Sequence, residues 1–270
     1  MHLRIQIPAR NEAATLAHTV TQAVAQAAAV LHRSDRLSVL IVDDGSTDAT
    51  PAICADLSSR DPRVRTLRRS RSVGLGAAFR AGVRCAQRDS VDVLLHLDGD
   101  GQHDPADLSV ILLPALNGDA DLVLGSRFSA TGLSEREIGW LARVGNHALS
   151  SAVSWASGQQ LADVSCGLRA FGPRAMRSMV DLRADYTYTH ESVLLAAAAG
   201  LHIVEVAITV AGRRAHGRSR LIAGPVRHAL RCACVIAATR VRVGGRRASS
   251  LAMPAPAWPR HVDDDQRVPS

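Results

Sequence analysis

The chain has 270 residues, 47% of them hydrophobic but only 3% aromatic, which predicts a core of alanine and aliphatic side chains. Its formal net charge of +7, with 32 arginines and no lysine, favours an anionic partner such as nucleic acid, a membrane surface or a phosphorylated substrate. So few aromatic rings argue against a base-stacking platform for single-stranded nucleic acid, and we expect no nucleic-acid partner.

The first half of the chain alternates apolar runs with helical patterns. Strands are expected at Leu3–Pro8, Leu37–Asp44, Arg63–Leu67, Val91–Asp98 and Ala120–Gly125. Helices are expected from Asn11 to about Leu31, from a cap near Asp48, from the Gly74–Gly76 turn to about Arg88, and from Pro105 onward. This alternation predicts an α/β fold with a mostly parallel, doubly wound sheet and helices on both faces.

The second half is richer in helical patterns. We expect helices around Ile138–Trp155, Pro173–Val180 and His190–Gly200, then a strand over Leu201–Val210. Residues beyond about Gly244 are polar and contain proline, which is typical of a disordered tail. The expected organisation is a catalytic domain over 1–222, a basic helix over 223–243 and a tail over 244–270.

The cysteines and the longest apolar stretches bear on location. Five scattered cysteines do not make a disulfide framework, so a reducing compartment fits. The start of the chain has no signal-peptide pattern, and the apolar run Cys232–Thr239 is far shorter than the roughly 20 residues of a membrane span. We expect a cytoplasmic protein that is soluble or peripheral on a membrane.

The stretch 223–243 has two open interpretations. Apolar residues recur at helical spacing, flanked by arginines: Val226, Leu230, Ala233, Ala237 and Val241, with Arg227, Arg231, Arg240 and Arg242. One interpretation is a basic amphipathic helix lying in a membrane interface. The other is a helix packed on the domain, and the sequence does not decide between them.

Polar clusters follow four of the predicted strands. They read "PARNE", "DDGS", "DGDGQ" and "GSRF" in chain order. In a doubly wound sheet, ligands bind outside the carboxyl ends of the strands, where these clusters would meet. The sequence therefore predicts a ligand site at this edge of the sheet.

The third cluster has the pattern of a metal site. Asp98 and Asp100 flank Gly99 at the end of a buried strand, and Gln102 offers a further carbonyl oxygen. Repelling carboxylates suit a hard cation, so we expect Mg²⁺ or Mn²⁺ bridging to a diphosphate. His96 and His103 are expected to be structural, since no Cys or His cluster completes a tetrahedral zinc site.

Two further stretches are predicted to serve the nucleotide. In "VDDGSTD", Asp48 is expected to cap a helix, while Asp43 is expected to bind a ribose hydroxyl or a base. "SVGLGAAFRAG" is not a dinucleotide fingerprint, because Phe79 stands where the third glycine belongs. We interpret it as a turn and helix start that lines the ligand pocket.

Seven motifs in order resemble one known family. They are "IPARNE", "VDDGSTDAT", "LDGDGQHDP", "GSRF", "DVSCGLRAF", the acidic helix position Glu191, fourteen residues before Glu205 in "IVEVAI", and "RAHGRSRL". Together, over residues 3–222, they resemble the family 2 glycosyltransferases of GT-A fold, in particular the dolichol- or polyprenol-phosphate mannosyltransferase group. The chain departs from that pattern at Arg10, where an aromatic residue is common, at Ala207 for proline and at Arg220 for lysine.

The resemblance implies a role for each matched residue. Those implied to bind the donor are Pro8, Arg10, Asn11, Glu12, Ile41, Asp43, Asp98, Gly99, Asp100 and Arg127. Those implied to hold the metal are Asp98, Asp100 and Gln102. Catalysis is implied for Asp100, Arg127, Arg214 and Arg220, and contact with an acceptor phosphate for Arg143, Arg169 and Arg214.

The implied reaction is an inverting transfer of a hexose, mannose favoured, from a nucleotide-diphosphate sugar to a polyprenyl phosphate. GDP-mannose and UDP-glucose are the leading donors. An anionic acceptor needs no strong base, and Asp163 and Glu191, the only candidates, are expected to be structural. The alternatives are a transferase acting on a soluble or cell-wall saccharide, and a non-catalytic nucleotide-sugar or nucleic-acid binding protein.

Overall fold

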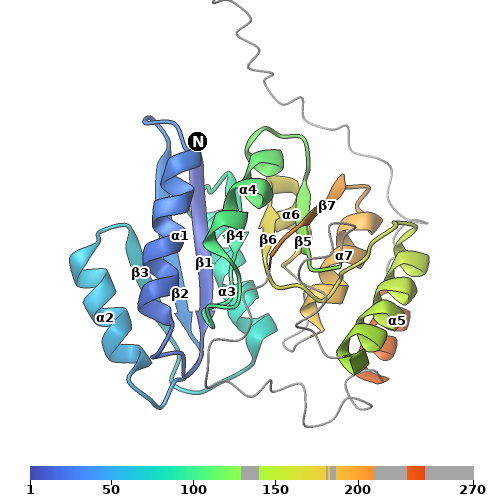
Figure 1. Cartoon of the computed structure of the whole chain (residues 1–270), viewed down its shortest axis with the longest axis horizontal. Coiled ribbons are helices and arrows are strands. Elements are labelled where there is room, and N and C mark those ends of the chain that lie inside the picture. Colours follow the sequence, from blue (N-terminus) through green and yellow to red (C-terminus); the bar gives the residue numbers. More distant parts are fainter. Residues whose placement is uncertain (129–139, 181, 183–186, 210–229, 241–270) are drawn as a thin grey trace, which may run out of the picture.

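A seven-stranded sheet forms the centre of the computed structural model, with helices on both faces (Figure 1). The structure describes residues 1–128, 140–180, 182, 187–209 and 230–240. The strands are β1 His2–Ala9, β2 Arg36–Asp43, β3 Val64–Arg68, β4 Val93–His96, β5 Leu122–Ser126, β6 Arg169–Phe171 and β7 Ile203–Ala207. Their order is β3-β2-β1-β4-β6-β5-β7, and only β6 is antiparallel to its neighbours. The predicted mostly parallel sheet is confirmed.

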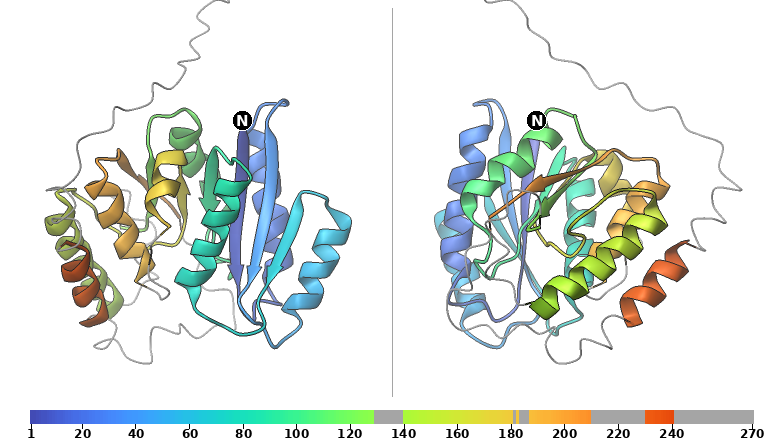
Figure 2. Two further views of the ribbon diagram at one scale, coloured as in Figure 1. Left: turned by 180° about the vertical axis from the view of Figure 1, so that it is seen from behind. Right: turned by 45° about the vertical axis from the view of Figure 1, so that its right-hand side comes forward.

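Two layers of helices enclose the sheet. They are α1 Leu16–Val30, α2 Thr50–Arg60, α3 Leu75–Arg88, α4 Leu108–Leu116, α5 Trp140–Ser157, α6 Pro173–Ser178 and α7 Tyr188–Ala198, with a 3-10 turn at Pro105–Asp107 and a further helix over 230–240. Side chains of α1, α2 and α4 share one core cluster, and those of α3, α5, α6 and α7 share another. Figure 2 shows α3 and α7 on the face opposite α1.

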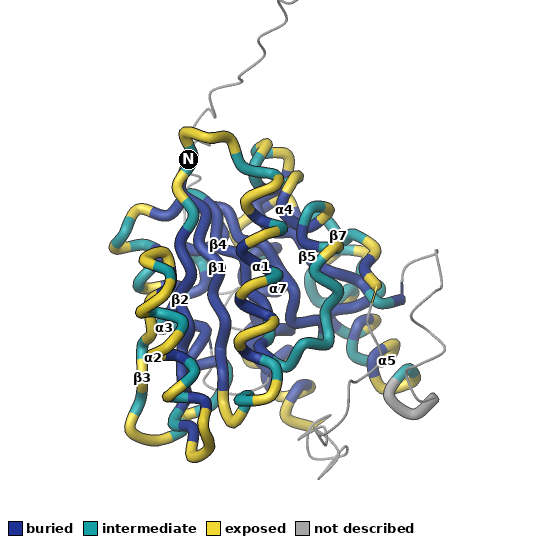
Figure 3. The backbone as a smooth tube through the Cα atoms, turned by 60° about the vertical axis from the view of Figure 1, so that its left-hand side comes forward, coloured by how far each residue is buried: buried dark blue, intermediate teal, exposed yellow. Residues whose placement is uncertain are grey.

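Strand β1, between β2 and β4, is buried along its whole length (Figure 3). Its two faces carry different side chains. Its odd-numbered apolar residues enter the cluster under α1, as the period of two requires. On the other face, the buried Gln6 donates from Nε2 to the carbonyl oxygens of Ala78 and Phe79, at 3.0 and 3.1 Å. A Cβ on Gly82 would lie 2.1 Å from the amide carbon of Gln6, so glycine at this position lets α3 approach the sheet.

The first helix begins later than predicted. It starts at Leu16, whereas the sequence pattern placed its start at Asn11. Asn11 has φ +57°, and its backbone N–H donates to Ser46 Oγ at 3.0 Å. The helix pattern could not reveal this because the bond joins two loops that are far apart in sequence.

One strand was missed altogether. No strand was predicted within Asp163–Phe171, but the last three residues of this segment form β6 between β4 and β5. Three residues are too few to show a periodicity of two, and all three are buried. The other elements of the second half lie close to their predicted positions, with shifted ends.

The C-terminal predictions are only partly covered by the structure. The tail over 244–270, Arg214 and Arg220 lie outside the described residues. Of the predicted helix over 223–243, residues 230–240 are described, and they are helical. Among the described helices, none combines the length and the apolar character that crossing a membrane requires.

Candidate active site

The loops after β1 and β2 are tied together by side-chain contacts with the backbone. Asn11 Oδ1 accepts from the Thr47 backbone N–H at 2.8 Å, and Thr50 Oγ1 accepts from the backbone N–H of Glu12 at 2.9 Å. Asp48 accepts from the Thr50 N–H at the start of α2 at 2.9 Å, although the N-cap position of α2 is Ala49 rather than Asp48. The side chain of Asn11, predicted to bind the donor, therefore braces the neighbouring loop.

Two adjacent carboxylates at the end of β2 have different surroundings. Asp43 is fully buried, and its Oδ1 accepts from the Ser46 N–H at 2.9 Å. Its Oδ2 has Arg68 Nε at 3.5 Å and accepts no hydrogen bond within the described part of the chain. Asp43 therefore keeps one acceptor atom at the edge where the nucleoside was predicted.

Asp44 was not singled out from the sequence, yet it fixes the loop before α3. Its carboxylate accepts from Ser72 Oγ at 2.6 Å and from the backbone N–H groups of Val73 and Gly74 at 3.1 and 3.0 Å. Burial raises the pKa of Asp44, but these bonds outweigh burial and hold the pKa below its usual value. The predicted pocket-lining turn is thus a loop held by a carboxylate.

Ile41 and Pro8 sit deeper than their predicted roles require. Ile41 is fully buried in the core cluster under α1, so the expected nucleoside contact is wrong in this structure and Ile41 is a core residue. Pro8 is also buried, opposite Val42 in the register of β1 with β2. Arg10 is exposed and Glu12 is half-buried in the loop that follows β1.

Asp98 lies beyond β4 with two imidazoles beside it. Its side chain is 28% exposed, and the Nε2 atoms of His96 and His103 lie 3.8 and 3.9 Å from its carboxylate oxygens. Burial raises the pKa of Asp98, but His103, His96 and the charge of Arg127 outweigh burial and lower the pKa overall. A Cβ on Gly167 would lie 2.1 Å from Asp98 Oδ2, so this carboxylate depends on a glycine across the site.

The turn around Gly99 holds Asp100 close to the first strand. A Cβ on Gly99 would lie 3.2 Å from the carbonyl oxygen of Pro8, a contact tighter than ordinary packing. Thr15 Oγ1 donates to the carbonyl oxygen of Gly99 at 2.8 Å, and Asp100 Oδ1 accepts from the Gln102 N–H at 3.1 Å. Gly99, implied by the resemblance to bind the donor, therefore also allows close approach to the backbone of β1.

The carboxylates after β4 suit a hard metal cation that is also bound by a substrate. Across the described residues, no group of three or more His, Cys, Asp and Glu side chains could hold a metal ion. Mg²⁺ is commonly bound by one or two carboxylates together with substrate phosphates and water, and Asp98 and Asp100 offer that number. His96 is fully buried and its Nε2 lies 2.9 Å from the Tyr188 hydroxyl, which fits its expected structural role.

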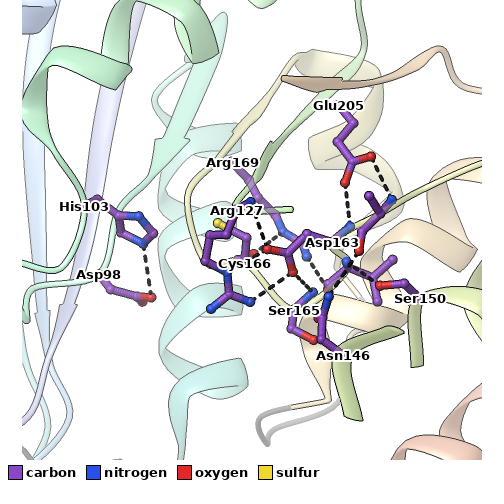
Figure 4. A network of polar contacts seen from close by, with 12 residues as sticks. Asp98, His103, Arg127, Asn146, Ser150, Asp163, Ser165, Cys166, Arg169 and Glu205 are labelled. Carbon is purple, nitrogen blue, oxygen red and sulfur yellow. Dashed lines mark hydrogen bonds and ion pairs between the residues drawn. The ribbon is translucent and has the colours of Figure 1, made fainter. Parts of the chain in front are cut away.

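Arg127, directly after β5, is held in one orientation by Asp163 (Figure 4). Its Nε and Nη2 donate to the two carboxylate oxygens at 2.6 and 2.9 Å, and its backbone N–H donates at 3.1 Å. Asp163 is fully buried, and its Oδ1 also accepts from the Ser165 N–H. Burial alone would lower the pKa of Arg127, but the Asp163 carboxylate raises it, so the guanidinium is permanently charged.

Two other predicted arginines have different positions. Arg169 is fully buried and donates to the carbonyl oxygens of Cys166, Thr189 and Val164 and to Ser192 Oγ, at 2.6–2.9 Å. The expected contact of Arg169 with an acceptor phosphate is therefore wrong in this structure, because its donors face the protein interior. Arg143 lies half-buried on α5.

The family follows from comparison with known proteins. The profile of the family described as glycosyl transferase family 2 matches residues 5–164. The chain belongs to this family. A polyprenol monophosphomannose synthase from Mycolicibacterium smegmatis is 34% identical over 206 residues, covering 74% of this chain and 76% of that protein. An undecaprenyl-phosphate mannosyltransferase from Micrococcus luteus is 33% identical over 204 residues, covering 71% and 79%.

Solved structures agree with the predicted GT-A fold of a family 2 glycosyltransferase. Glucosyl-3-phosphoglycerate synthase from Mycobacterium tuberculosis, in complex with Mn²⁺, UDP and glucosyl-3-phosphoglycerate, matches with a TM-score of 0.62 at 18% identity, over 89% of this chain and 80% of that chain. A mannosyltransferase from Pyrobaculum calidifontis in complex with GDP-Man and Mn²⁺ has a TM-score of 0.51 at 17% identity, over 93% and 76%. At these identities the likeness establishes the fold alone.

The two candidate bases of this glycosyltransferase are both withdrawn from solvent. Asp163 accepts its hydrogen bonds from Arg127 and Ser165, and Glu191 is fully buried on α7. A general base must lie within hydrogen-bond reach of the proton that it removes. Glu205, for which no role was predicted from the sequence, contacts the loop that carries Asp163.

Proposed function

We propose that the protein is an inverting glycosyltransferase that moves a hexose, mannose favoured, from a nucleotide-diphosphate sugar to a polyprenyl phosphate. The observation that carries this proposal concerns Asp163. This carboxylate is fully buried, and both of its oxygens accept hydrogen bonds from the Arg127 guanidinium. A hydroxyl acceptor requires a base, whereas a phosphate monoester is already anionic at neutral pH. Two relatives that match about three quarters of the chain carry polyprenol- or undecaprenyl-phosphate mannosyl transfer in their names.

In the proposed reaction, an acceptor phosphate oxygen attacks the anomeric carbon from the face opposite the leaving group. The bond from that carbon to the diphosphate oxygen breaks, and the anomeric configuration inverts. Arg127 would face the departing diphosphate with the part of its guanidinium that Asp163 does not occupy. Arg214, Arg220 and Arg143 are proposed to neutralise phosphates from the second half of the chain.

The proposed metal site consists of Asp98, Asp100 and Gln102. Bound there, Mg²⁺ or Mn²⁺ would act as a Lewis acid toward the diphosphate. The site would hold Asp98 ionised, since His103, His96 and Arg127 lower its pKa despite its burial. Structures of the same fold have been solved with Mn²⁺ and a nucleotide, which supports the choice of metal.

Asp43 is proposed to accept a hydrogen bond from the nucleoside through its Oδ2. Reaching that atom requires the Arg68 side chain, 62% exposed, to move aside from its 3.5 Å contact. Arg10, Asn11 and Glu12 would form the rim of the same pocket, with Gly99 behind them. GDP-mannose and UDP-glucose are the donors to compare, because the solved structures of this fold include complexes with GDP-Man and with UDP.

The acceptor would be reached at a membrane surface. Helix 230–240 packs on the domain through Cys232, Val235 and Ile236, and Arg240 lies over the ring of Trp155 at 3.9 Å. Of the predicted stripe, the described residues Leu230, Ala233 and Ala237 instead face solvent. Large apolar side chains remain exposed there: Val144 (58%), Trp155 (74%) and Leu230 (63%).

Neither α5 nor helix 230–240 contains an acidic residue, and Arg143, Arg231 and Arg240 lie on them. An apolar surface flanked by arginines suits the headgroup region of an anionic bilayer. We therefore propose that this face, called the α5 face below, rests on the membrane that holds the lipid acceptor. The proposed location is the cytoplasmic side of that membrane.

The test is transfer of label from radioactive GDP-mannose or UDP-glucose into polyprenyl phosphate with Mg²⁺ or Mn²⁺ present. Label in the lipid phase, lost on chelation and in Asp100→Ala, would support the proposal and name the donor. Label in a water-soluble saccharide would move the acceptor to a hydroxyl. Donor binding with no turnover toward any acceptor would overturn the proposal in favour of a binding protein.

A further inference from the structure

We propose that Glu205 is a positioning residue, which orients the Arg127 guanidinium by holding the backbone that carries Asp163. The inference rests on the proposed role of Arg127 toward the diphosphate. Glu205 lies on β7, opposite Leu124 of β5 in the parallel register, and Arg127 directly follows β5. The two side chains are therefore placed by one pair of neighbouring strands.

Glu205 binds two successive backbone N–H groups with its two oxygens. Oε1 accepts from the N–H of Asp163 at 2.6 Å, and Oε2 accepts from the N–H of Ala162 at 2.8 Å. Bonds from backbone N–H groups to an ionised carboxylate are roughly twice as strong as neutral ones. Because the pair is bidentate, it fixes the direction of the backbone at Asp163 as well as its distance from the sheet.

The orientation of the Asp163 carboxylate in turn sets the orientation of the Arg127 guanidinium. Its two oxygens accept from Nε and Nη2 of Arg127, in the fork geometry that sets the plane of a guanidinium. Figure 4 shows Glu205 on one side of Asp163 and Arg127 on the other, with the guanidinium between Asp163 and Asp98. The described contacts of Arg127 leave its Nη1 for a ligand.

The residues on either side of Asp163 are held by other bonds. The N–H of Val164 donates to Ser150 Oγ at 3.2 Å, and the Val164 carbonyl oxygen accepts from Arg169 Nη2 at 2.7 Å. The carbonyl oxygen of Ala162 accepts from Asn146 Nδ2 at 3.1 Å, and the N–H of Leu161 donates to Ser154 Oγ at 3.1 Å. None of these bonds acts on the amide of Asp163. A displacement of the reacting groups by about 1 Å can lower the rate about a hundredfold, so an orienting contact outside the site affects turnover.

The amide variant tests this geometry because it changes few atoms. In Glu205→Gln, one oxygen can still accept, but the new NH₂ group faces a backbone N–H instead of accepting from it. The expected result is a fall in kcat of about tenfold, with the KM for the donor changed less than about twofold. Glu205→Ala should lower kcat further, since it removes both acceptors.

A double-mutant cycle separates positioning from general stabilisation. In the Arg127→Ala background, Glu205→Gln should have no further effect on kcat, because the group that it orients is gone. The matched control is Asp121→Asn: Asp121 also accepts from a backbone N–H, that of His202 at 3.0 Å, at the opposite end of β5 and β7. It should lower the unfolding midpoint and leave kcat of the folded protein unchanged.

A readout independent of turnover keeps the test valid if the proposed acceptor is wrong. The Nε–H proton of Arg127 should exchange slowly with solvent in the parent protein and measurably faster in Glu205→Gln, by NMR of the full chain. Unchanged exchange and unchanged kcat in Glu205→Gln would overturn the inference, as would additive effects in the cycle. Absence of lipid-linked product from the parent protein would overturn only the proposed function, and the exchange measurement would still decide the role of Glu205.

Discussion

In both halves of the site a buried carboxylate fixes a loop, but one half presents carboxylate oxygens to a ligand and the other presents a guanidinium. In each half a buried carboxylate accepts from backbone N–H groups: Asp44, directly after β2, holds the loop before α3, and Asp163, in the loop before β6, holds the segment at Arg127. The first half then presents acceptors, Asp43 Oδ2 and the carboxylates of Asp98 and Asp100. The second half presents a cation. The contrast indicates that the nucleoside and metal belong to one half and phosphate charge to the other.

Loss of the Arg127 guanidinium should have the largest effect. Arg127→Ala removes a charge aimed at the proposed leaving group, and kcat should fall by about 10²–10³-fold. Turnover with polyprenyl phosphate at saturating donor is the measurement. Arg174→Ala is the matched control. Arg174 forms an ion pair with Asp121 (Nη1 to Oδ2, 3.0 Å) outside the site, so its loss should affect stability alone. Equal kcat in the parent protein and in Arg127→Ala would show that Arg127 has no part in the mechanism.

The half of the site that carries Asp98 and Asp100 can be tested through the proposed metal. Gly167→Ala places a Cβ about where Asp98 Oδ2 now lies, so the carboxylate must move. The Mn²⁺ concentration for half-maximal activity should rise by about 10–100-fold, measured as activity against Mn²⁺. Gly145→Ala on α5 is the control, since a Cβ there meets nothing within 4 Å. An unchanged Mn²⁺ dependence in Gly167→Ala would exclude Asp98 as a ligand.

The α5 face should show a smaller effect, on binding to lipid rather than on chemistry. Trp155→Ser with Leu230→Ser should weaken binding to phosphatidylglycerol vesicles about tenfold, measured by co-sedimentation. Val110 and Leu113 on α4 are exposed to 43% and 45%, and their serine variants are the control. Turnover with a short water-soluble prenyl phosphate should be the same in both pairs. Equal vesicle binding by both pairs would place the membrane contact elsewhere.

The loop carboxylate of the first half should affect stability and leave the proposed chemistry unchanged. Asp44→Asn should lower the free energy of unfolding by about 1–3 kcal/mol at pH 7, measured in urea. The folded pKa of Asp44 lies below its unfolded value, so this stabilisation is present above the unfolded pKa and is lost as the pH falls through the folded pKa. The difference between parent and variant should therefore shrink below about pH 4. A constant difference down to pH 2 would contradict the assigned pKa direction.

The sequence was a better guide to the first half than to the second. The positions of β1, β2 and β4 follow from apolar runs, and the roles of Asp48 and His96 follow from local pattern. The bracing role of Asn11 could not be predicted because its partners lie more than thirty residues away. Ile41 was assigned to the nucleoside through resemblance, although its place in an apolar run already indicated the core.

The second half depends on contacts that no local pattern contains. Arg169 resembles a phosphate ligand in sequence, yet its donors are used by carbonyl oxygens up to twenty residues away. Glu205 looks like one residue of an alternating strand, and only its place beside the Asp163 loop reveals its partners. Helix 230–240 is apolar on two faces, so the stripe read from the sequence was not the face that packs.

The most direct test of the central claim is the anomeric configuration of the product formed from GDP-α-mannose and polyprenyl phosphate, determined by NMR of the purified lipid. The account predicts a phosphodiester between the anomeric carbon and the lipid phosphate, with β configuration, formed only with a divalent metal. An α-linked product, or a hexose attached to a hydroxyl, would contradict inverting transfer to an anionic acceptor.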